Sequence, residues 1–237
     1  MDKKLDELSV FFPFWNEEKN IEKVVGMAIP IVSKVARRWE IIMVDDGSSD
    51  NTLKLAEKLA RTDARLKVAT HQPNRGYGAA LKEGFANSKY NVIIFTDGDS
   101  QFDFSEVIKF IEKIDTADFV IGYREERRDH PFRRFLMKML KIWDLVFFEF
   151  YFKDIDCGFK MFRKKSLQKI LPFRSEGAMI TTEILAKAKK AGLKVDQVKI
   201  THFPRKFGDQ SGGNVRVILR AIKESFVLWW DLHYGRS

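Results

Sequence analysis

The chain has 237 residues, 45% of them hydrophobic, which suits one large domain with a sizeable core. Its net charge of +9 indicates an anionic partner: nucleic acid, a membrane surface or a phosphorylated substrate. The single cysteine, Cys157, excludes intrachain disulfides, is typical of a reducing compartment, and is expected to be structural. We expect no signal peptide and no transmembrane helix, because Pro13 and charged residues interrupt every apolar run before about 18 residues.

The first half of the chain alternates between apolar strands and helices. Strands are predicted at residues 8–12, 40–44, 66–70, 90–94 and 119–122. Helices are predicted from Asn16, as the N-cap, to about Arg38, from near Asn51, and through residues 79–81. This alternation is typical of an α/β protein with a mainly parallel sheet, helices on both faces, and ligands beyond the carboxyl ends of the strands.

Two carboxylates follow the fourth predicted strand. Asp97 and Asp99 are separated only by Gly98, so both can turn toward one hard cation while the glycine leaves room for a phosphate-bearing ligand. The alternative is a polar turn that opens the next helix, with Ser100 or Asp103 as its cap. Both interpretations are open from these residues alone.

The loops after Pro13, Val44 and Thr96 open onto the same edge of the predicted sheet, and all three are acidic. In a chain of net positive charge, this contrast indicates a site for a metal and a polar ligand. Within the second loop we expect Asp46 to contact a ligand and Asp50 to cap the following helix.

The second half of the chain carries basic and aromatic segments. After the fifth strand, arginines and lysines accompany large apolar residues at helical spacing up to Phe150. This basic helix faces either the core or an anionic lipid surface, and both interpretations are open. Strand, helix and strand follow at residues 154–163, 176–190 and 194–202. The glycine-rich, basic segment 203–213 suits a loop that closes on phosphate. A last amphipathic helix, from Val215, carries Trp229 and Trp230, which again indicate an interface.

Seven motifs occur in an order that resembles one known family. They are SVFFPFWNEEKNI, IIMVDDGSSDNT, NRGYGAALKEGF, FTDGDSQFD, VIGYREERR, DIDCGFKMFR and HFPRKFGDQSGG, between Ser9 and Gly213. In this order they resemble the inverting GT-A glycosyltransferases of family 2, in the branch of dolichyl-phosphate mannose synthase and polyprenyl-phosphate sugar transferases. The resemblance implies one GT-A, Rossmann-like α/β domain over residues 1–237, with a nucleotide-sugar-binding half at 8–123, an acceptor half at 124–213 and a C-terminal amphipathic helix at 214–234.

The resemblance also implies roles for individual residues. The residues implied to surround the nucleoside are Pro13, Trp15, Glu17, Val44 and Asp46. The residues implied to hold a Mg²⁺ or Mn²⁺ ion are Asp97, Asp99 and Gln101, with Gly98 close to the diphosphate. Arg205 would hold the diphosphate from the closing loop, and together with the two aspartates it is the expected catalytic group.

The implied reaction moves a hexose from a nucleotide-diphosphate sugar, such as GDP-mannose or UDP-glucose, to a polyprenyl or dolichyl phosphate with inversion. The metal and Arg205 would stabilise the charge that develops on the leaving diphosphate. A lipid monophosphate, with a second pKa of about 6, is an anionic nucleophile and needs cations more than a base. We assign it to Arg124, Arg133 and, in the closing loop, Ser211. The expected location is cytoplasmic, peripheral on the cytoplasmic face of the membrane, and no nucleic-acid-binding signature is present.

Two other functions are open from the sequence. The first keeps the enzyme but gives it a saccharide hydroxyl as acceptor, which requires a carboxylate base such as Asp156 or Glu183. The second is a non-catalytic basic module that docks on a membrane or a nucleic acid. The intact set of Asp97, Asp99 and Gln101 argues against such a module.

Overall fold

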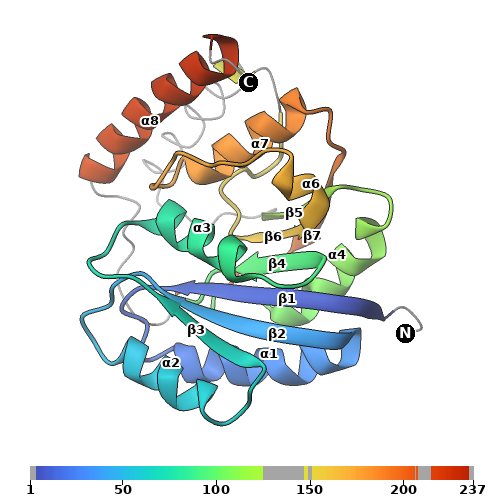
Figure 1. Cartoon of the computed structure of the whole chain (residues 1–237), viewed down its shortest axis with the longest axis vertical. Coiled ribbons are helices and arrows are strands. Elements are labelled where there is room, and N and C mark those ends of the chain that lie inside the picture. The colour runs from blue at the N-terminus through green and yellow to red at the C-terminus, as the bar shows by residue number, and fades with distance from the viewer. Residues whose placement is uncertain (1–3, 125–146, 149–150, 206, 208–214, 235–237) are drawn as a thin grey trace.

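The computed structural model describes residues 4–124, 147–148, 151–205, 207 and 215–234. In these parts the chain folds around one seven-stranded sheet with the strand order β3-β2-β1-β4-β6-β5-β7 (Figure 1). The strands are β1 (Leu5–Phe14), β2 (Ala36–Asp45), β3 (Leu66–Thr70), β4 (Val92–Thr96), β5 (Phe119–Arg124), β6 (Phe159–Arg163) and β7 (Val195–Ile200). The helices are α1 (Ile21–Val35), α2 (Thr52–Ala60), α3 (Tyr77–Asn87), α4 (Val107–Ile114), α6 (Lys164–Gln168), α7 (Ile180–Lys190) and α8 (Val215–Tyr234), with a 3-10 turn at Phe104–Glu106.

The sheet is mainly parallel, as predicted. β1 pairs in parallel with β2 and β4, β2 with β3, and β5 with β7. Among the described strands, β6 alone runs antiparallel to its neighbours, β4 and β5. The segment that precedes β6 therefore reaches the carboxyl end of β4, where Phe159 pairs with Thr96. This brings residues 154–158 beside the turn that contains Asp97.

Helices cover both faces of the sheet, also as predicted. Successive side chains of β1 point to opposite faces, so Phe12 and Phe14 join one buried cluster while Phe11 joins another. Apolar residues of α1 and α4 complete the first cluster, and those of α3 and α7 complete the second. In the second cluster, Phe11 and Phe162 stack on either side of Phe95, with ring centroids 5.2 and 5.9 Å away. These two apolar layers hold the strand ends in fixed positions.

The first helix does not begin as predicted. Asn16 is not its N-cap, because α1 begins at Ile21 and Asn16 has a left-handed backbone with φ of 55°. The side-chain oxygen of Asn16 accepts hydrogen bonds from the backbone N–H and the hydroxyl of Ser49, at 2.8 and 3.2 Å. Asn16 therefore joins the loop after β1 to the loop after β2.

The same helix ends earlier than predicted. It stops at Val35, and residues 36–38 extend β2 instead. The reason is the long pairing of β1 with β2, which starts where Leu5 lies opposite Ala36. Pairing with a neighbouring strand is a tertiary effect, and here it outweighs the helical spacing of the local sequence.

Asp103 is the predicted N-cap of the 3-10 turn, whereas the N-cap of α2 is Asn51 and Asp50 precedes it. One predicted helix lies outside the described residues. The carboxylate of Asp103 accepts the N–H of Ser105, and that of Asp50 accepts the N–H of Thr52, both at 2.9 Å. The predicted basic helix after β5 falls on residues that the structure does not describe, except Arg124 and residues 147–148. The predicted C-terminal helix is present as α8, beside α7 and far from α1 and α2 (Figure 1).

Candidate active site

The turn after β4 holds Asp97 in a defined position. Its backbone N–H donates to the carbonyl of Gly158 at 3.1 Å, and its Oδ1 accepts from the hydroxyl of Tyr77 at 2.8 Å. A Cβ atom on Gly158 would lie 2.0 Å from Oδ2 of Asp97, so this close approach requires glycine. Burial, together with the neighbouring charge of Asp99, raises the pKa of Asp97 to about 7.

Asp99 is linked to a segment far along the chain. Its Oδ1 accepts the backbone N–H of Gln101 at 3.1 Å, and its Oδ2 accepts from Arg205 at 3.3 Å. Gln101 bonds twice to Phe203: its side-chain amide donates to the Phe203 carbonyl at 3.0 Å, and its own carbonyl accepts the Phe203 N–H at 2.8 Å. Burial raises the pKa of Asp99. Hydrogen bonds therefore join the turn after β4 to the segment after β7.

Arg205 bridges two carboxylates. Its guanidinium forms ion pairs with Asp99 and Glu17, and its Nε donates to the carbonyl of Phe207 at 2.8 Å. Glu17 is buried, its second oxygen accepts from the amide of Asn20 at 2.6 Å, and burial raises its pKa. The loops after β1, β4 and β7 thus meet at Arg205, which brings together three residues that the sequence analysis placed at the site.

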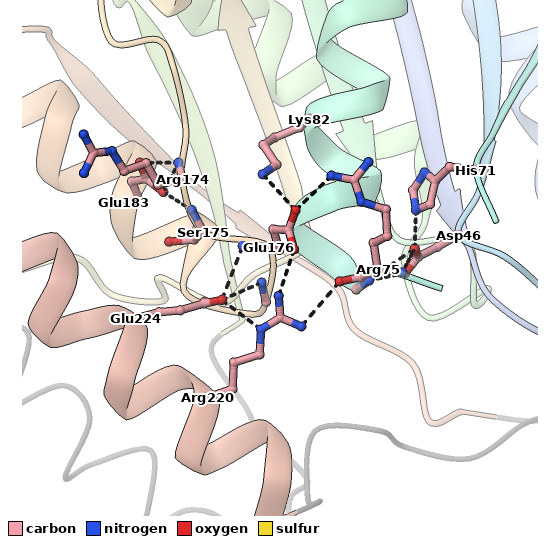
Figure 2. Close-up of polar contacts among 12 residues, drawn as sticks. Asp46, His71, Arg75, Lys82, Arg174, Ser175, Glu176, Glu183, Arg220 and Glu224 are labelled. Atoms are coloured by element: carbon pink, nitrogen blue, oxygen red, sulfur yellow. Dashed lines mark hydrogen bonds and ion pairs between the residues drawn. The ribbon is translucent and has the colours of Figure 1, made fainter. Parts of the chain in front are cut away.

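Asp46 organises the loop that follows β3. Its carboxylate accepts the backbone N–H groups of Arg75 and Gly76, each at 3.0 Å (Figure 2). It also accepts from the amide of Asn74 at 2.9 Å and lies 2.6 Å from Nε2 of His71. Asp46 is only 4% exposed. Asp46 therefore holds this loop beside the carboxyl end of β2, and its contact with a ligand stays a prediction.

Arg124, which the sequence analysis assigned to the acceptor phosphate, is bound to a carboxylate. Its Nε and Nη2 lie 2.6 and 3.0 Å from the two oxygens of Asp154, and the two side chains are 13% and 1% exposed. Next to this pair, the fully buried ammonium of Lys160 donates to the carbonyls of Ile155 and Cys157. Burial lowers the pKa of Lys160 and raises that of Cys157 to about 12, in line with a structural cysteine.

The other residues implied at the nucleoside and the diphosphate differ in exposure. Pro13 and Val44 lie opposite each other in β1 and β2 and are buried, so they support the site from within the sheet. Trp15 is 46% exposed and offers a ring to a ligand. A Cβ on Gly98 would lie 2.3 Å from the ring of Phe14, so the chain passes close to β1 here. Outside the described residues lie Arg133 and Ser211.

The sequence analysis missed four residues that shape the site. They are His71, Tyr77, Asp154 and Lys160. Three of them act on partners that lie 20 to 30 positions away, and local spacing carries no signal for such contacts. For Lys160 the local sequence did contain a signal, because a lysine within the apolar strand Phe159–Arg163 is a charge that needs buried partners.

The residues at the turn after β4 fit a divalent cation. Among the described residues, no three His, Cys, Asp or Glu side chains converge as a ready metal-binding cluster. Asp97 and Asp99 nevertheless supply two close carboxylates, the ligand type that Mg²⁺ and Mn²⁺ prefer. A cation bound there would take its remaining oxygens from a ligand, as Mg²⁺ commonly does from substrate phosphates.

Comparison with curated proteins gives three informative relatives. The dolichyl-phosphate beta-glucosyltransferase of Saccharomyces cerevisiae is 30% identical over 220 residues, which cover 82% of this chain and 66% of that protein. An undecaprenyl-phosphate 4-deoxy-4-formamido-L-arabinose transferase of Salmonella choleraesuis is 26% identical, covering 90% of this chain and 65% of that protein. The glycosyltransferase AglD of Haloferax volcanii is 25% identical, covering 95% and 37%. The chain therefore spans about two thirds or less of these relatives.

Comparison with solved structures supports the fold. Glucosyl-3-phosphoglycerate synthase from Mycobacterium tuberculosis, in complex with Mn²⁺, UDP and phosphoglyceric acid, superposes with a TM-score of 0.69 at 18% identity, covering 98% of this chain and 80% of that one. This likeness confirms the predicted GT-A fold. Residues 9–171 match the family model described as glycosyl transferase family 2. With that match over most of its length, and a relative at 30% identity, the chain belongs to glycosyl transferase family 2.

Proposed function

We propose that this protein transfers a hexose from a nucleotide-diphosphate sugar to a polyprenyl phosphate, with inversion and with dependence on a divalent metal. The observation that carries the proposal is the convergence of Glu17, Asp97, Asp99 and Arg205 at the carboxyl edge of the sheet. Such open α/β sheets bind their ligands at this edge. The names of the yeast and Salmonella relatives, which refer to dolichyl and undecaprenyl phosphate, support a lipid phosphate as the acceptor.

Asp97 and Asp99 are the groups that would hold Mg²⁺ or Mn²⁺. Tyr77 and the backbone of residue 158 keep Asp97 in place, while the N–H of Gln101 orients Asp99. When bound, the cation supplies Lewis-acid stabilisation of the charge that develops on the leaving diphosphate. The coordination of the cation by two carboxylates leaves room for diphosphate oxygens.

Arg205 is the group that would bind the diphosphate directly. Its planar guanidinium presents several N–H donors in a fork that suits phosphate oxygens. In the structure, the same donors contact Glu17 and Asp99. Binding of the diphosphate therefore replaces carboxylate partners of Arg205 with phosphate partners, and the bonds between Gln101 and Phe203 keep the arginine near the turn.

The acceptor phosphate requires cations rather than a base, because its oxygen is already anionic at neutral pH. Arg133 lies in a basic stretch that we assign to this role, together with Ser211. Arg124 can take part only by sharing a guanidinium that already has two nitrogens on Asp154. Direct displacement by the phosphate oxygen would invert the anomeric centre.

The surface of α8 supports attachment to a membrane. Its exposed large apolar residues are Ile222, Phe226, Val227, Trp230 and Tyr234. On its other side, Leu228 packs with Phe148 and Leu185 in a buried cluster. A helix that is apolar on both sides needs a second apolar environment, and tryptophan and tyrosine are typical of membrane interfaces. We therefore propose a peripheral protein on the cytoplasmic face. No helix in the described part of the chain is long and apolar enough to span a bilayer.

A saccharide hydroxyl is the second candidate acceptor, and the structure separates its two possible bases. Burial alone would raise the pKa of Glu183, but Lys187 and the N–H groups of Ser175 and Arg174 lower it overall. A carboxylate with such partners is a poor base. Asp156 is exposed, so it is the better candidate for this alternative.

The test is transfer of radiolabelled sugar from GDP-mannose and UDP-glucose into a butanol-extractable product, with polyprenyl phosphate in detergent. We expect metal-dependent label in the lipid phase, reduced roughly 10²-fold or more in Asp99→Ala. Asp6→Ala, which removes a carboxylate from the surface, is the matched control and should be unaffected. Metal-dependent hydrolysis of the donor without labelled lipid would favour the saccharide acceptor and Asp156. Absence of both reactions and of nucleotide binding would leave the docking module as the best account.

A further inference from the structure

A residue of α8 contacts the loop that carries the partners of Asp46. Nη1 of Arg220 donates to the backbone carbonyl of Arg75 at 3.4 Å, and its Nη2 donates to a side-chain oxygen of Glu176 at 3.3 Å (Figure 2). Arg75 itself binds the other oxygen of Glu176 at 2.9 Å. The carboxylate of Glu176 thus joins two arginines, one on the loop after β3 and one on α8.

The segment around Glu176 is packed tightly on the start of α3. The carbonyl of Glu176 accepts the N–H of Gly78 at 2.8 Å, in the first turn of that helix. A Cβ on Gly76 or Gly78 would lie 2.8 or 2.7 Å from the backbone of this residue, so neither position has room for a side chain. Because Gly76 also donates to Asp46, a shift of the segment at Glu176 would reach Asp46 directly.

A second side chain of α8 fixes Arg220 in this orientation. Oε1 of Glu224, one helical turn further on, accepts from Nε of Arg220 at 2.9 Å. The same oxygen is 3.4 and 3.3 Å from the N–H groups of Glu176 and Gly177, which donate to it. Arg220 and Glu224 together therefore hold both the carboxylate and the backbone of this segment.

The space between α8 and the segment before α7 is incompletely filled. A cavity of about 230 Å³ lies there, and Arg174, Arg220, Lys223 and Glu224 are among its lining residues. The hydrogen bonds of Arg220 and Glu224 to this segment lie beside the cavity and contribute to the attachment of the helix.

We propose that Arg220 is a positioning residue for the donor-binding loop, so that nucleotide binding near Asp46 and the seating of α8 on the sheet domain stabilise each other. The inference rests on the proposed function and on the place beside the nucleoside that the family resemblance implies for Asp46. Arg220 acts through Glu176, Arg75 and Gly76, and it does not touch the nucleotide. By thermodynamic linkage the two effects are equal. If packing of α8 on the sheet domain raises the affinity for nucleotide by a given factor, a bound nucleotide raises the equilibrium constant for that packing by the same factor. The packing of α8, the helix that we propose to face the membrane, thereby depends on whether nucleotide occupies the donor site.

The test compares two variants of the full chain that each remove one positive charge from α8. Titration calorimetry with UDP and with GDP, each in the presence of Mn²⁺, measures the affinity for nucleotide. We expect Arg220→Gln to bind the preferred nucleotide about three- to tenfold more weakly than the wild type. Lys223→Gln lines the same cavity but has no part in the chain of contacts, and its affinity should stay within about twofold. Glu176→Gln, on the opposite side of the contact, should weaken binding in the same way.

A second readout separates positioning from general destabilisation. Hydrogen exchange should show that nucleotide slows the amides of α8 in the wild type and in Lys223→Gln, but not in Arg220→Gln. In the transfer assay, Arg220→Gln should raise the KM for the nucleotide sugar and leave the KM for polyprenyl phosphate unchanged.

Equal affinities and equal exchange in Arg220→Gln and Lys223→Gln would overturn the inference and leave the proposed function standing. If the wild type binds neither nucleotide, the proposed function fails and the inference fails with it. If Arg220→Gln unfolds, Glu176→Gln decides the question by the same two measurements.

Discussion

Asp97 and Asp99 place two acidic groups at the carboxyl end of β4, where burial disfavours their charged forms. Arg205 compensates Asp99 directly, whereas Asp97 has a neutral hydroxyl, that of Tyr77, as its hydrogen-bond donor. Two buried carboxylates therefore lie close together at this turn, and burial raises the pKa of both. Perturbed pKa values of this kind are typical of functional sites.

The raised pKa of Asp97 has a consequence for stability. In the folded, metal-free protein this pKa is about 7, whereas in the unfolded chain it is about 3.9. The folded state then binds the proton of Asp97 more tightly than the unfolded chain does. Protonation of Asp97 therefore stabilises the folded state fully below about pH 4, and this stabilisation is lost as the pH rises through 7. We expect Asp97→Asn, with chelator present, to melt at a higher temperature than the wild type at pH 8. The difference should shrink steadily toward pH 4 in thermal unfolding, and a difference independent of pH would contradict this account.

Arg124 and Asp154 form the second residue-level feature with a measurable consequence. Removal of one partner from a buried pair leaves the other charge uncompensated. We expect Arg124→Gln to lower the free energy of unfolding by about 3 kcal/mol in denaturant titrations. Arg37→Gln removes an arginine from an exposed pair with Asp6 and should have no measurable effect. An arginine that only bound an acceptor would show no such loss, so unchanged stability would return Arg124 to that role alone.

At the scale of elements, the two helices α1 and α3 differ in how closely they approach their neighbours. Gly26 lies on the exposed side of α1, with nothing within 4 Å of an added Cβ. Gly84 lies on the buried side of α3, where an added Cβ would be 2.4 Å from the ring of Phe11. That ring cannot yield easily, because it stacks on Phe95. The glycine in α3 is therefore what lets the helix lie close to β1.

The same substitution should consequently have opposite effects in the two helices. Gly26→Ala should raise the free energy of unfolding by about 0.5–1 kcal/mol, because alanine favours a helix interior. Gly84→Ala should lower it by about 1–3 kcal/mol through overpacking. Chemical denaturation of the two variants beside the wild type measures both changes. Stabilisation by both substitutions would show that α3 can move away from the sheet without cost.

At the scale of the whole molecule, a net charge of +9 is combined with an acidic edge and an exposed apolar surface on α8. Carboxylates gather at the carboxyl ends of the strands, where Arg124 and Arg205 form ion pairs with some of them. We expect this arrangement to orient the protein on an anionic membrane, by attraction at long range and by insertion of aromatic side chains at short range.

Binding to lipid vesicles tests this arrangement. We expect the protein to sediment with vesicles that contain roughly one third phosphatidylglycerol, and to be released as salt rises from about 0.05 M to about 0.5 M. Trp230→Ala should weaken binding severalfold, because this residue is 61% exposed on α8. Met27→Ala, which removes a similarly apolar group exposed on α1, is the control and should leave binding unchanged. Equal effects of both substitutions would exclude α8 as the attachment surface.

The sequence determined the alternation of strands and helices, the parallel sheet and the motif Asp97-Gly98-Asp99 after β4. Each of these can be predicted from residues that are close in the sequence, since apolar spacing and turn residues act over one element at a time. The family resemblance followed from the order of such local motifs, and the match over residues 9–171 confirms it. Where only local spacing was available, as at the end of α1, the prediction was wrong by a few residues.

Only the tertiary structure decided which side chains are available to a ligand. Arg205 with Glu17, Arg124 with Asp154, and Arg220 with Glu176 are pairs whose members lie far apart in the sequence. Their formation depends on the direction of β6, the packing of helices on the sheet and the position of α8, none of which is encoded in a short stretch. The sequence therefore determined which chemical groups this protein carries, and the tertiary structure decided which of them face one another.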